Sequence, residues 1–145
     1  MRRHERRAMK IKNIAFVVLS LFGLSCEQST SPTRPKIGEE FELKYGQSTQ
    51  IQGQNLSIKF KNVAEDSRCP KGAFCVWEGN AKIVLQVAQQ DTSVNTSLEP
   101  REITYSRYPT YTIRLVSVSP YPNMSEQIKL EDYTIKLIVF TDEIF

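Results

Sequence analysis

This sequence is poor in histidine, and that scarcity excludes several kinds of chemistry. Its 145 residues include one histidine, His4, which lies near the N-terminus. A mature chain that has lost His4 cannot use a Ser-His or Cys-His catalytic pair, and it cannot build a histidine-rich zinc site. The sequence also contains no cofactor-binding motif. It therefore predicts no cofactor, no metal ion and no enzymatic activity. A carboxylate-dependent hydrolase stays open as an alternative, because Asp and Glu pairs can work without histidine.

Long hydrophobic runs are also scarce, and the clear one lies at the N-terminus. Residues 1–12 are basic, Ile14–Leu24 are almost wholly apolar, and Ser25-Cys26 follow. A basic region, an apolar run of about 7–15 residues and a small-residue cleavage site describe a secretory signal. A membrane-spanning helix needs roughly 20 apolar residues. We therefore predict a cleaved signal peptide over residues 1–25, with Met9 as an alternative start of translation.

Only three cysteines are present, and an odd cysteine needs an explanation in an exported protein. Cys26 supplies it, because this residue stands where a bacterial lipoprotein signal is cut and lipidated. Leu24 departs from the usual lipoprotein pattern, which has a small residue or glycine near this point. Ordinary secretion with a free thiol and an uncleaved segment are the alternatives. A cysteine with several acyl chains anchors a protein stably, so the sequence predicts a cell-envelope protein held by Cys26 on the outer membrane, at its periplasmic or surface face.

The charge of the mature chain argues against nucleic acid as a partner. Six of the 19 Lys and Arg residues and one of the 16 Asp and Glu residues lie in the signal, which leaves 13 basic and 15 acidic residues and a net charge of −2. Nucleic-acid-binding proteins carry a clustered basic face. The mature sequence has no basic run, so we predict no nucleic-acid binding.

After a Ser-, Thr- and Pro-rich tether over residues 26–36, apolar and polar residues alternate with the period of β-strands. The expected strands are 41–43, 49–51, 56–63, 81–87, 94–98, 103–105, 111–118 and 133–140, with a turn at 89–93 and one helical turn within 124–130. Leu137–Phe140 are continuously apolar, which predicts a central strand buried on both faces. Residues 37–145 are therefore expected to form one all-β domain, an Ig-like antiparallel β-sandwich of about seven or eight strands.

The stretch Asp66–Ala81 holds the two remaining cysteines, the single tryptophan and two of the six glycines. We interpret it as a connection between two strands that is closed by a structural disulfide between Cys69 and Cys75. Closing so short a loop stabilises a fold by about 2 kcal/mol in the chain-entropy model. A redox-active pair is disfavoured because the spacing is not C-x-x-C, and a metal site is disfavoured because two thiolates lack further partners.

The same stretch resembles a known family. Ser67-Arg68-Cys69-Pro70, Cys75, Trp77 and Gly79 match the pattern S-R-C-P-x-x-x-x-C-x-W-x-G. Small, mostly uncharacterised bacterial secreted proteins and lipoproteins carry this pattern. Three further segments fit as well: Glu65-Asp66, Pro120-Tyr121-Pro122 and Glu131-Asp132-Tyr133. The resemblance covers roughly Phe41 to Val139, and it implies a β-sandwich and an extracytoplasmic location. It implies no activity and no catalytic residue.

Several side chains are candidates for a binding surface. Arg68, Lys71, Phe74 and Glu78 are expected on the exposed face of the disulfide loop, with Arg68 bracing it through an ion pair to Asp66. Tyr108 and Tyr121 belong to a group of tyrosines and prolines that predicts either a binding rim or simple hinge packing; its other members are Tyr105, Tyr111, Pro109, Pro120 and Pro122. Trp77 is expected to pack at the core edge, with ligand stacking as the alternative.

These features predict a binding or envelope-structural module whose partner is an envelope protein or a glycan, in addition to the membrane reached by the lipid anchor. A proteinaceous inhibitor of an extracellular protease is the first alternative, with Ser106–Thr110 and Ser119–Ser125 as its inhibitory loops. A weaker hypothesis places Ca²⁺ among six carboxylates that would have to meet at one end of the domain. They are Glu65, Asp66, Glu131, Asp132, Asp142 and Glu143.

Overall fold

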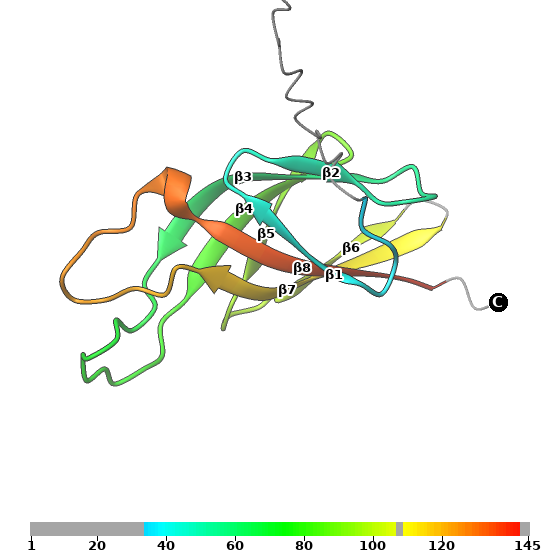
Figure 1. The fold of residues 1–145 in the computed structure, drawn as a ribbon. Coiled ribbons are helices and arrows are strands. Elements are labelled where there is room, and N and C mark those ends of the chain that lie inside the picture. The colour runs from blue at the N-terminus through cyan, green and yellow to red at the C-terminus, as the bar shows by residue number, and fades with distance from the viewer. Residues whose placement is uncertain (1–33, 107–108, 143–145) are drawn as a thin grey trace, which may run out of the picture. The chain divides into compact units, whose positions relative to one another are not determined.

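The computed structural model describes residues 34–106 and 109–142. The predicted signal, Cys26 and most of the tether lie outside the described residues, as does Tyr108. Eight strands form two four-stranded antiparallel sheets (Figure 1). No helix of the described residues has the length and apolar character needed to cross a membrane. The expected Ig-like antiparallel β-sandwich is confirmed.

Each sheet has a simple order of strands. The first sheet runs β1 (Glu40–Lys44), β8 (Thr134–Thr141), β7 (Thr110–Ser119) and β6 (Glu102–Ser106). The second runs β2 (Ser48–Gln50), β3 (Ser57–Asp66), β4 (Ala81–Val87) and β5 (Gln90–Asn95). One 3₁₀ turn, η1 (Leu130–Asp132), precedes β8 and takes the place of the helical turn expected within 124–130.

The core lies between the two sheets, because every second side chain of the long strands points inward. In β4, Ala81, Ile83, Leu85 and Val87 are buried and alternate with more exposed residues. The matching buried residues of the other long strands are Ile58 and Phe60 in β3, Ile113 and Leu115 in β7, and Ile135, Leu137 and Val139 in β8. This alternation is what made the strands predictable from sequence.

Strand β8 is central, as expected, but it is fully buried on one face only. It pairs with β1 on one side and with β7 on the other. Ile138 and Phe140 point to the outer face and are half-buried. No second layer of the described residues covers them; the Arg114 guanidinium lies 5.2 Å from the centre of the Phe140 ring. The prediction of burial on both faces was therefore wrong, because a long surface side chain shields this face without packing a core against it.

The expected turn at 89–93 was also wrong. The structure turns at Ala88 and Gln89, and Asp91, Thr92 and Ser93 already pair with β4. The register between β4 and β5 is set by Val94 of β5, which is buried opposite Ile83 of β4. The polar residues of β5 lie on an edge strand, so they lack the apolar alternation that marks the other strands.

The two ends of the sandwich carry different features. At one end, which we call the stapled end, the β3–β4 loop (residues 67–80) and the β7–β8 loop (residues 120–129) extend together (Figure 1). At the opposite end lie the β2–β3 and β4–β5 turns and the start of the described chain. Pro35 is buried there, and its carbonyl accepts a hydrogen bond from the Gln52 N–H at 2.8 Å. The described part of the predicted tether, residues 34–36, is therefore attached to the domain.

Candidate functional site

The base of the β3–β4 loop continues the pairing of its two strands. The Ser67 N–H donates to the Asn80 carbonyl at 2.7 Å, and the Cys69 N–H donates to the Glu78 carbonyl at 2.8 Å. Cys69 and Cys75 form the expected disulfide, with Cα atoms 6.0 Å apart. Backbone pairing fixes the two arms of the loop and the disulfide closes its tip, so the tip is held in one conformation.

Arg68 joins this loop to the β7–β8 loop. Its side chain is only 6% exposed and forms a two-point contact with Asp66, Nε to Oδ1 at 2.8 Å and Nη2 to Oδ2 at 2.7 Å. The same guanidinium donates to the carbonyls of Val118 at 2.6 Å and Pro120 at 2.9 Å. The expected ion pair is confirmed, but the expectation that Arg68 lies on the exposed face was wrong. Backbone acceptors from a distant loop draw this side chain inward.

Asp66 receives a second donor from β8. The Tyr133 hydroxyl donates to its Oδ2 at 2.8 Å. Burial raises the pKa of Asp66, but the hydrogen bonds from Arg68 and Tyr133 and the charge of Arg68 outweigh burial, so this pKa lies below its ordinary value of 3.8. Burial, together with the hydrogen bond to the Asp66 carboxylate, raises the pKa of Tyr133 to about 12. The three side chains therefore form a buried group in which Asp66 is held charged and Tyr133 is held protonated.

This group predicts a specific loss of stability at alkaline pH. The folded chain holds the Tyr133 proton more tightly than the unfolded chain, whose pKa is the ordinary 10.0. The resulting stabilisation is complete below the unfolded pKa and is lost as the pH rises towards about 12. Urea unfolding between about pH 9 and pH 12 should show this loss in the wild type. A Tyr133→Phe variant, which has no phenol to ionise, should lack that part of the pH dependence; an identical dependence in both proteins would contradict the assignment.

Asn80 fastens the far arm of the loop and was missed by the sequence reasoning. Its side chain is 3% exposed, and its Nδ2 donates to Asn95 Oδ1 at 3.0 Å. Its Oδ1 accepts the Ser97 N–H at 3.2 Å. The sequence does not reveal that Asn80 is buried, because an asparagine in a polar loop is usually exposed. Its partners, Asn95 and Ser97, come from β5 and the β5–β6 loop.

The β7–β8 loop lies directly against the disulfide loop. The Lys71 N–H donates to the Pro122 carbonyl at 2.9 Å. Tyr121 lies under the Arg68 guanidinium, whose Cζ is 5.0 Å from the centre of the tyrosine ring. The Met124 methyl lies 3.5 Å from the position that a Cβ on Gly72 would occupy. The two loops therefore present one continuous surface at the stapled end.

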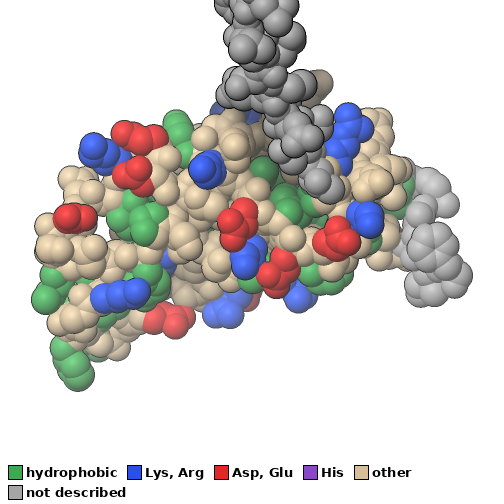
Figure 2. All heavy atoms as spheres, viewed as in Figure 1, with side chains coloured by type: hydrophobic (Ala, Val, Ile, Leu, Met, Phe, Trp, Pro, Cys, Tyr) green, Lys and Arg blue, Asp and Glu red, His purple; other side chains and the backbone are tan. Residues whose placement is uncertain are grey.

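The outermost part of this surface is apolar. Phe74 is 102% exposed, Val76 90%, Trp77 75% and Met124 69%. We call these four residues the apolar tip. Figure 2 shows hydrophobic side chains projecting from the same end of the molecule as the two loops of Figure 1. The expectation that Trp77 packs at the core edge was wrong, because its loop extends past both sheets and its ring has no core to reach.

The remaining candidates divide between the two ends. Lys71, Phe74 and Glu78 are exposed at the stapled end, as expected, and Tyr121 is 44% exposed beside them. Tyr105 and Tyr111 face each other across β6 and β7 at the opposite end. The predicted tyrosine rim is therefore not one surface. The two proposed inhibitory loops are separated in the same way, because β7 lies between Ser106–Thr110 and Ser119–Ser125.

The predicted meeting of carboxylates is not observed in the described part of the chain. Asp66 ends β3 at the stapled end, whereas Asp142 accepts the Thr110 N–H at the opposite end of β7, at 3.1 Å. Glu143 lies outside the described residues. Within residues 34–106 and 109–142, no group of three or more His, Cys, Asp or Glu side chains could hold a metal ion.

No protein-family model, curated protein or solved structure matches this chain.

Proposed function

We propose that this chain is an extracytoplasmic lipoprotein that works as a non-catalytic binding module, docking another protein of the cell envelope through the apolar tip. The observation that carries the proposal is the outward position of Phe74, Val76 and Trp77 on a loop whose base is fixed by the buried Arg68. Exposing large apolar side chains to water is unfavourable. Holding them rigidly reduces the entropy lost when a partner covers them.

The composition of the tip favours a protein partner over a lipid surface. Trp, Phe and Met are enriched at the centres of protein interfaces, which are surrounded by a polar rim. The exposed charges nearby are of both signs, with Lys71 opposed by Glu78 and Glu126. A loop that binds an anionic membrane usually adds several basic residues to its apolar ones. The tip has no such surplus.

The N-terminal features support an envelope location for this docking. The predicted signal peptide and the predicted lipidation of Cys26 support a location outside the cytoplasm, and the resemblance carried by the S-R-C-P pattern implies the same location. The described chain starts at the end opposite the apolar tip.

Site-specific cross-linking in intact envelopes tests the proposal. The photoreactive residue p-benzoylphenylalanine, placed at Phe74 in the full chain, should capture one partner in stoichiometric amount. The same probe at Val116, an exposed apolar residue of β7 that is 42% exposed, should not. Replacing Trp77 by Ser in the Phe74-probe chain should reduce capture at least about tenfold, as loss of an interface anchor does.

Two outcomes would contradict the proposal. Equal capture from positions 74 and 116 would mean that the tip is not the contact surface. Binding of the purified chain to anionic vesicles that depends on Trp77 would assign the tip to a lipid surface instead. The Trp77→Ser chain should keep the wild-type urea midpoint, because this side chain is exposed and contributes little to the core.

A further inference from the structure

The opposite end of the sandwich contains a cavity of about 500 Å³. Pockets that bind small molecules in proteins have volumes of roughly 300–1,000 Å³. The cavity opens between the β2–β3 turn, the β4–β5 turn and strands β6 and β7. Its polar and aromatic lining includes Gln54, Asn55, Ser57, Gln89, Tyr105 and Tyr111.

The described part of the lining is polar. Among the described residues that line the cavity, none is Lys, Arg, Asp, Glu or His. A charged ligand would lose hydration there without meeting an opposite charge, which is unfavourable. A strongly apolar ligand would cover amides and hydroxyls without offering them hydrogen bonds, which is also unfavourable. The cavity therefore favours a neutral ligand that is rich in hydroxyl or amide groups.

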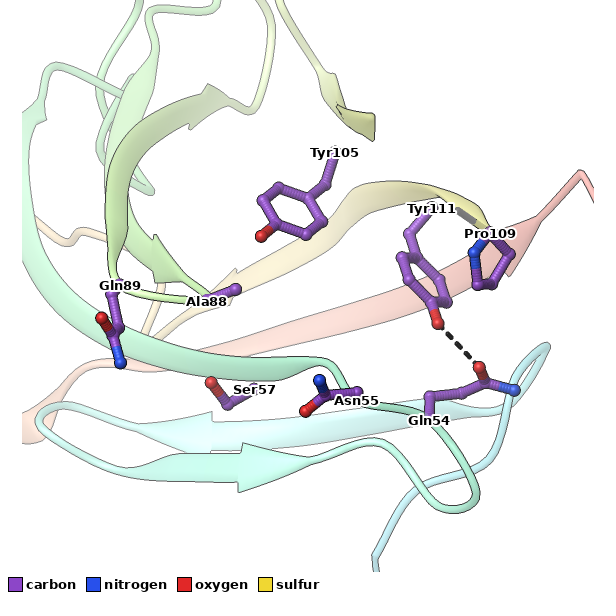
Figure 3. A pocket seen from close by; sticks show the side chains of 8 residues that line it. All are labelled: Gln54, Asn55, Ser57, Ala88, Gln89, Tyr105, Pro109 and Tyr111. Carbon is purple, nitrogen blue, oxygen red and sulfur yellow. Dashed lines mark hydrogen bonds between the residues drawn. The ribbon is translucent and has the colours of Figure 1, made fainter. Parts of the chain in front are cut away.

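The polar groups face two aromatic rings. Figure 3 shows the side chains of Tyr105 and Tyr111 reaching towards a row formed by Gln89, Ser57, Asn55 and Gln54. The Tyr111 hydroxyl donates to Gln54 Oε1 at 2.7 Å, which fixes the orientation of that amide. Tyrosine rings offer flat apolar faces, and each amide offers both donors and an acceptor.

Several of these polar groups have no protein partner. In the part of the chain that the structure describes, the side chains of Asn55, Ser57 and Gln89 make no hydrogen bond to another residue. Their donors and acceptors are solvated at the cavity wall and can exchange water for ligand hydroxyls. The exchange brings little cost when the ligand supplies the same hydrogen bonds.

The β4–β5 turn is strained in a way that places a side chain at the cavity. Ala88 has φ +44° and Gln89 has φ +77°. Two-residue turns of this kind strongly prefer Asn-Gly or Asp-Gly, because both central residues take positive φ. Glycine at position 89 would relieve the strain but would remove the amide. Residues held in strained backbone conformations cluster at ligand-binding and active sites.

We propose that this cavity binds a neutral saccharide. A pyranose ring offers a C–H face to the half-buried Tyr105 and hydroxyls to the amides of Asn55, Gln89 and Gln54. Tyr105 also lines a separate hollow of about 200 Å³ between β5 and β6, whose lining includes the charged Asp91, so the neutral site is the larger cavity alone. A peptide is the less favoured ligand, because the lining offers no apolar subsite for its side chains. The proposal is independent of docking through the apolar tip.

Binding of defined oligosaccharides to the full chain tests this proposal. Maltohexaose, cellohexaose, laminarihexaose and mannohexaose are titrated separately, and amide chemical shifts are followed up to about 1 mM ligand, the weak end of specific affinity. At least one neutral oligosaccharide should bind and shift residues of the β2–β3 and β4–β5 turns. Trigalacturonate, an anionic saccharide, and a capped Gly-Ser hexapeptide should not bind.

Two variants separate loss of the site from loss of the fold. Gln89→Gly should weaken saccharide binding about tenfold while raising the urea midpoint, because it removes both the amide and the strained φ. Tyr105→Leu should weaken binding by a similar factor, whereas Tyr121→Leu at the stapled end should not change it. No binding by any of the four oligosaccharides, binding of the peptide instead, or full binding by both cavity variants would overturn the proposal.

Discussion

Replacing Arg68 by Met should destabilise the folded domain by about 3–5 kcal/mol, the range measured when one partner of a buried ion pair is removed. The substitution leaves the Asp66 carboxylate charged and only 9% exposed, with Tyr133 as its remaining side-chain donor. It also removes the donors to the carbonyls of Val118 and Pro120. Because domains of this size have a total stability of about 5–15 kcal/mol, the variant should unfold at a much lower urea concentration than the wild type.

A matched control for Arg68 lies on the surface of the same domain. Arg114 pairs with Glu102 at 2.9 Å, but these side chains are 53% and 47% exposed, against 6% and 9% for Arg68 and Asp66. Arg114→Met should therefore cost no more than about 1 kcal/mol. Equal midpoints for the two methionine variants would mean that the Arg68 contacts do not hold the loops together.

A second comparison identifies the source of the loss. Adding Asp66→Asn to Arg68→Met removes the uncompensated charge, so the double variant should recover part of the stability that the single variant loses. Arg68→Lys keeps the charge but cannot make the two-point contact and reach both carbonyls, because an ammonium is a single point of donation. It should fall between wild type and Arg68→Met.

The sequence predicted the sandwich well because its long strands obey a local rule. In β3, β4 and β8 each buried residue is separated from the next by one more exposed residue, and β7 follows the same alternation up to Leu115. This period is readable without any knowledge of partners. The disulfide was predictable for a different reason. Once Cys26 is expected to carry the lipid anchor, Cys69 and Cys75 are the two cysteines that remain to pair.

The candidate site was less predictable because its contacts join residues far apart in the chain. Arg68 is buried by carbonyls of Val118 and Pro120, and a backbone acceptor leaves no mark in the amino-acid sequence. The exposure of Trp77 depends on how far its loop extends beyond the sheets, which no local pattern reports. The Ala88-Gln89 turn lacks the Asn-Gly pair that usually marks such turns, so its position was missed.

The two ends of the domain differ in structure, although the same two sheets connect them. At the stapled end, buried charges and a disulfide fix loops that extend into solvent. At the opposite end, short turns surround a cavity lined by solvated amides. Strands β3 and β7 run between the two ends, so substitutions at one end can be tested with the other as an internal control. This separation is what allows the docking and saccharide proposals to fail independently.

Replacing Gly79 by Ala should destabilise the domain by about 3 kcal/mol or more. A Cβ at this position would lie 1.8 Å from the Ser67 carbonyl oxygen and 2.8 Å from the Arg68 Cα, both backbone atoms that cannot move alone. Relieving the clash would separate the arms of the loop and break the hydrogen bonds from Ser67 to Asn80 and from Cys69 to Glu78. Each such bond contributes about 1 kcal/mol, and the positive φ of +75° adds about 1 kcal/mol of strain for any residue with a Cβ.

Gly53 supplies the control for the backbone conformation alone. Its φ is +74°, but a Cβ there would meet nothing within 4 Å. Gly53→Ala should therefore cost only about 1 kcal/mol, and the difference between the two alanine variants measures the close approach of the loop arms. Urea unfolding gives both values, provided that the slope m stays constant. If Gly79→Ala costs no more than Gly53→Ala, the arms of the loop are not in contact at Ser67, and the rigid presentation of Trp77 and Phe74 would lose its structural basis.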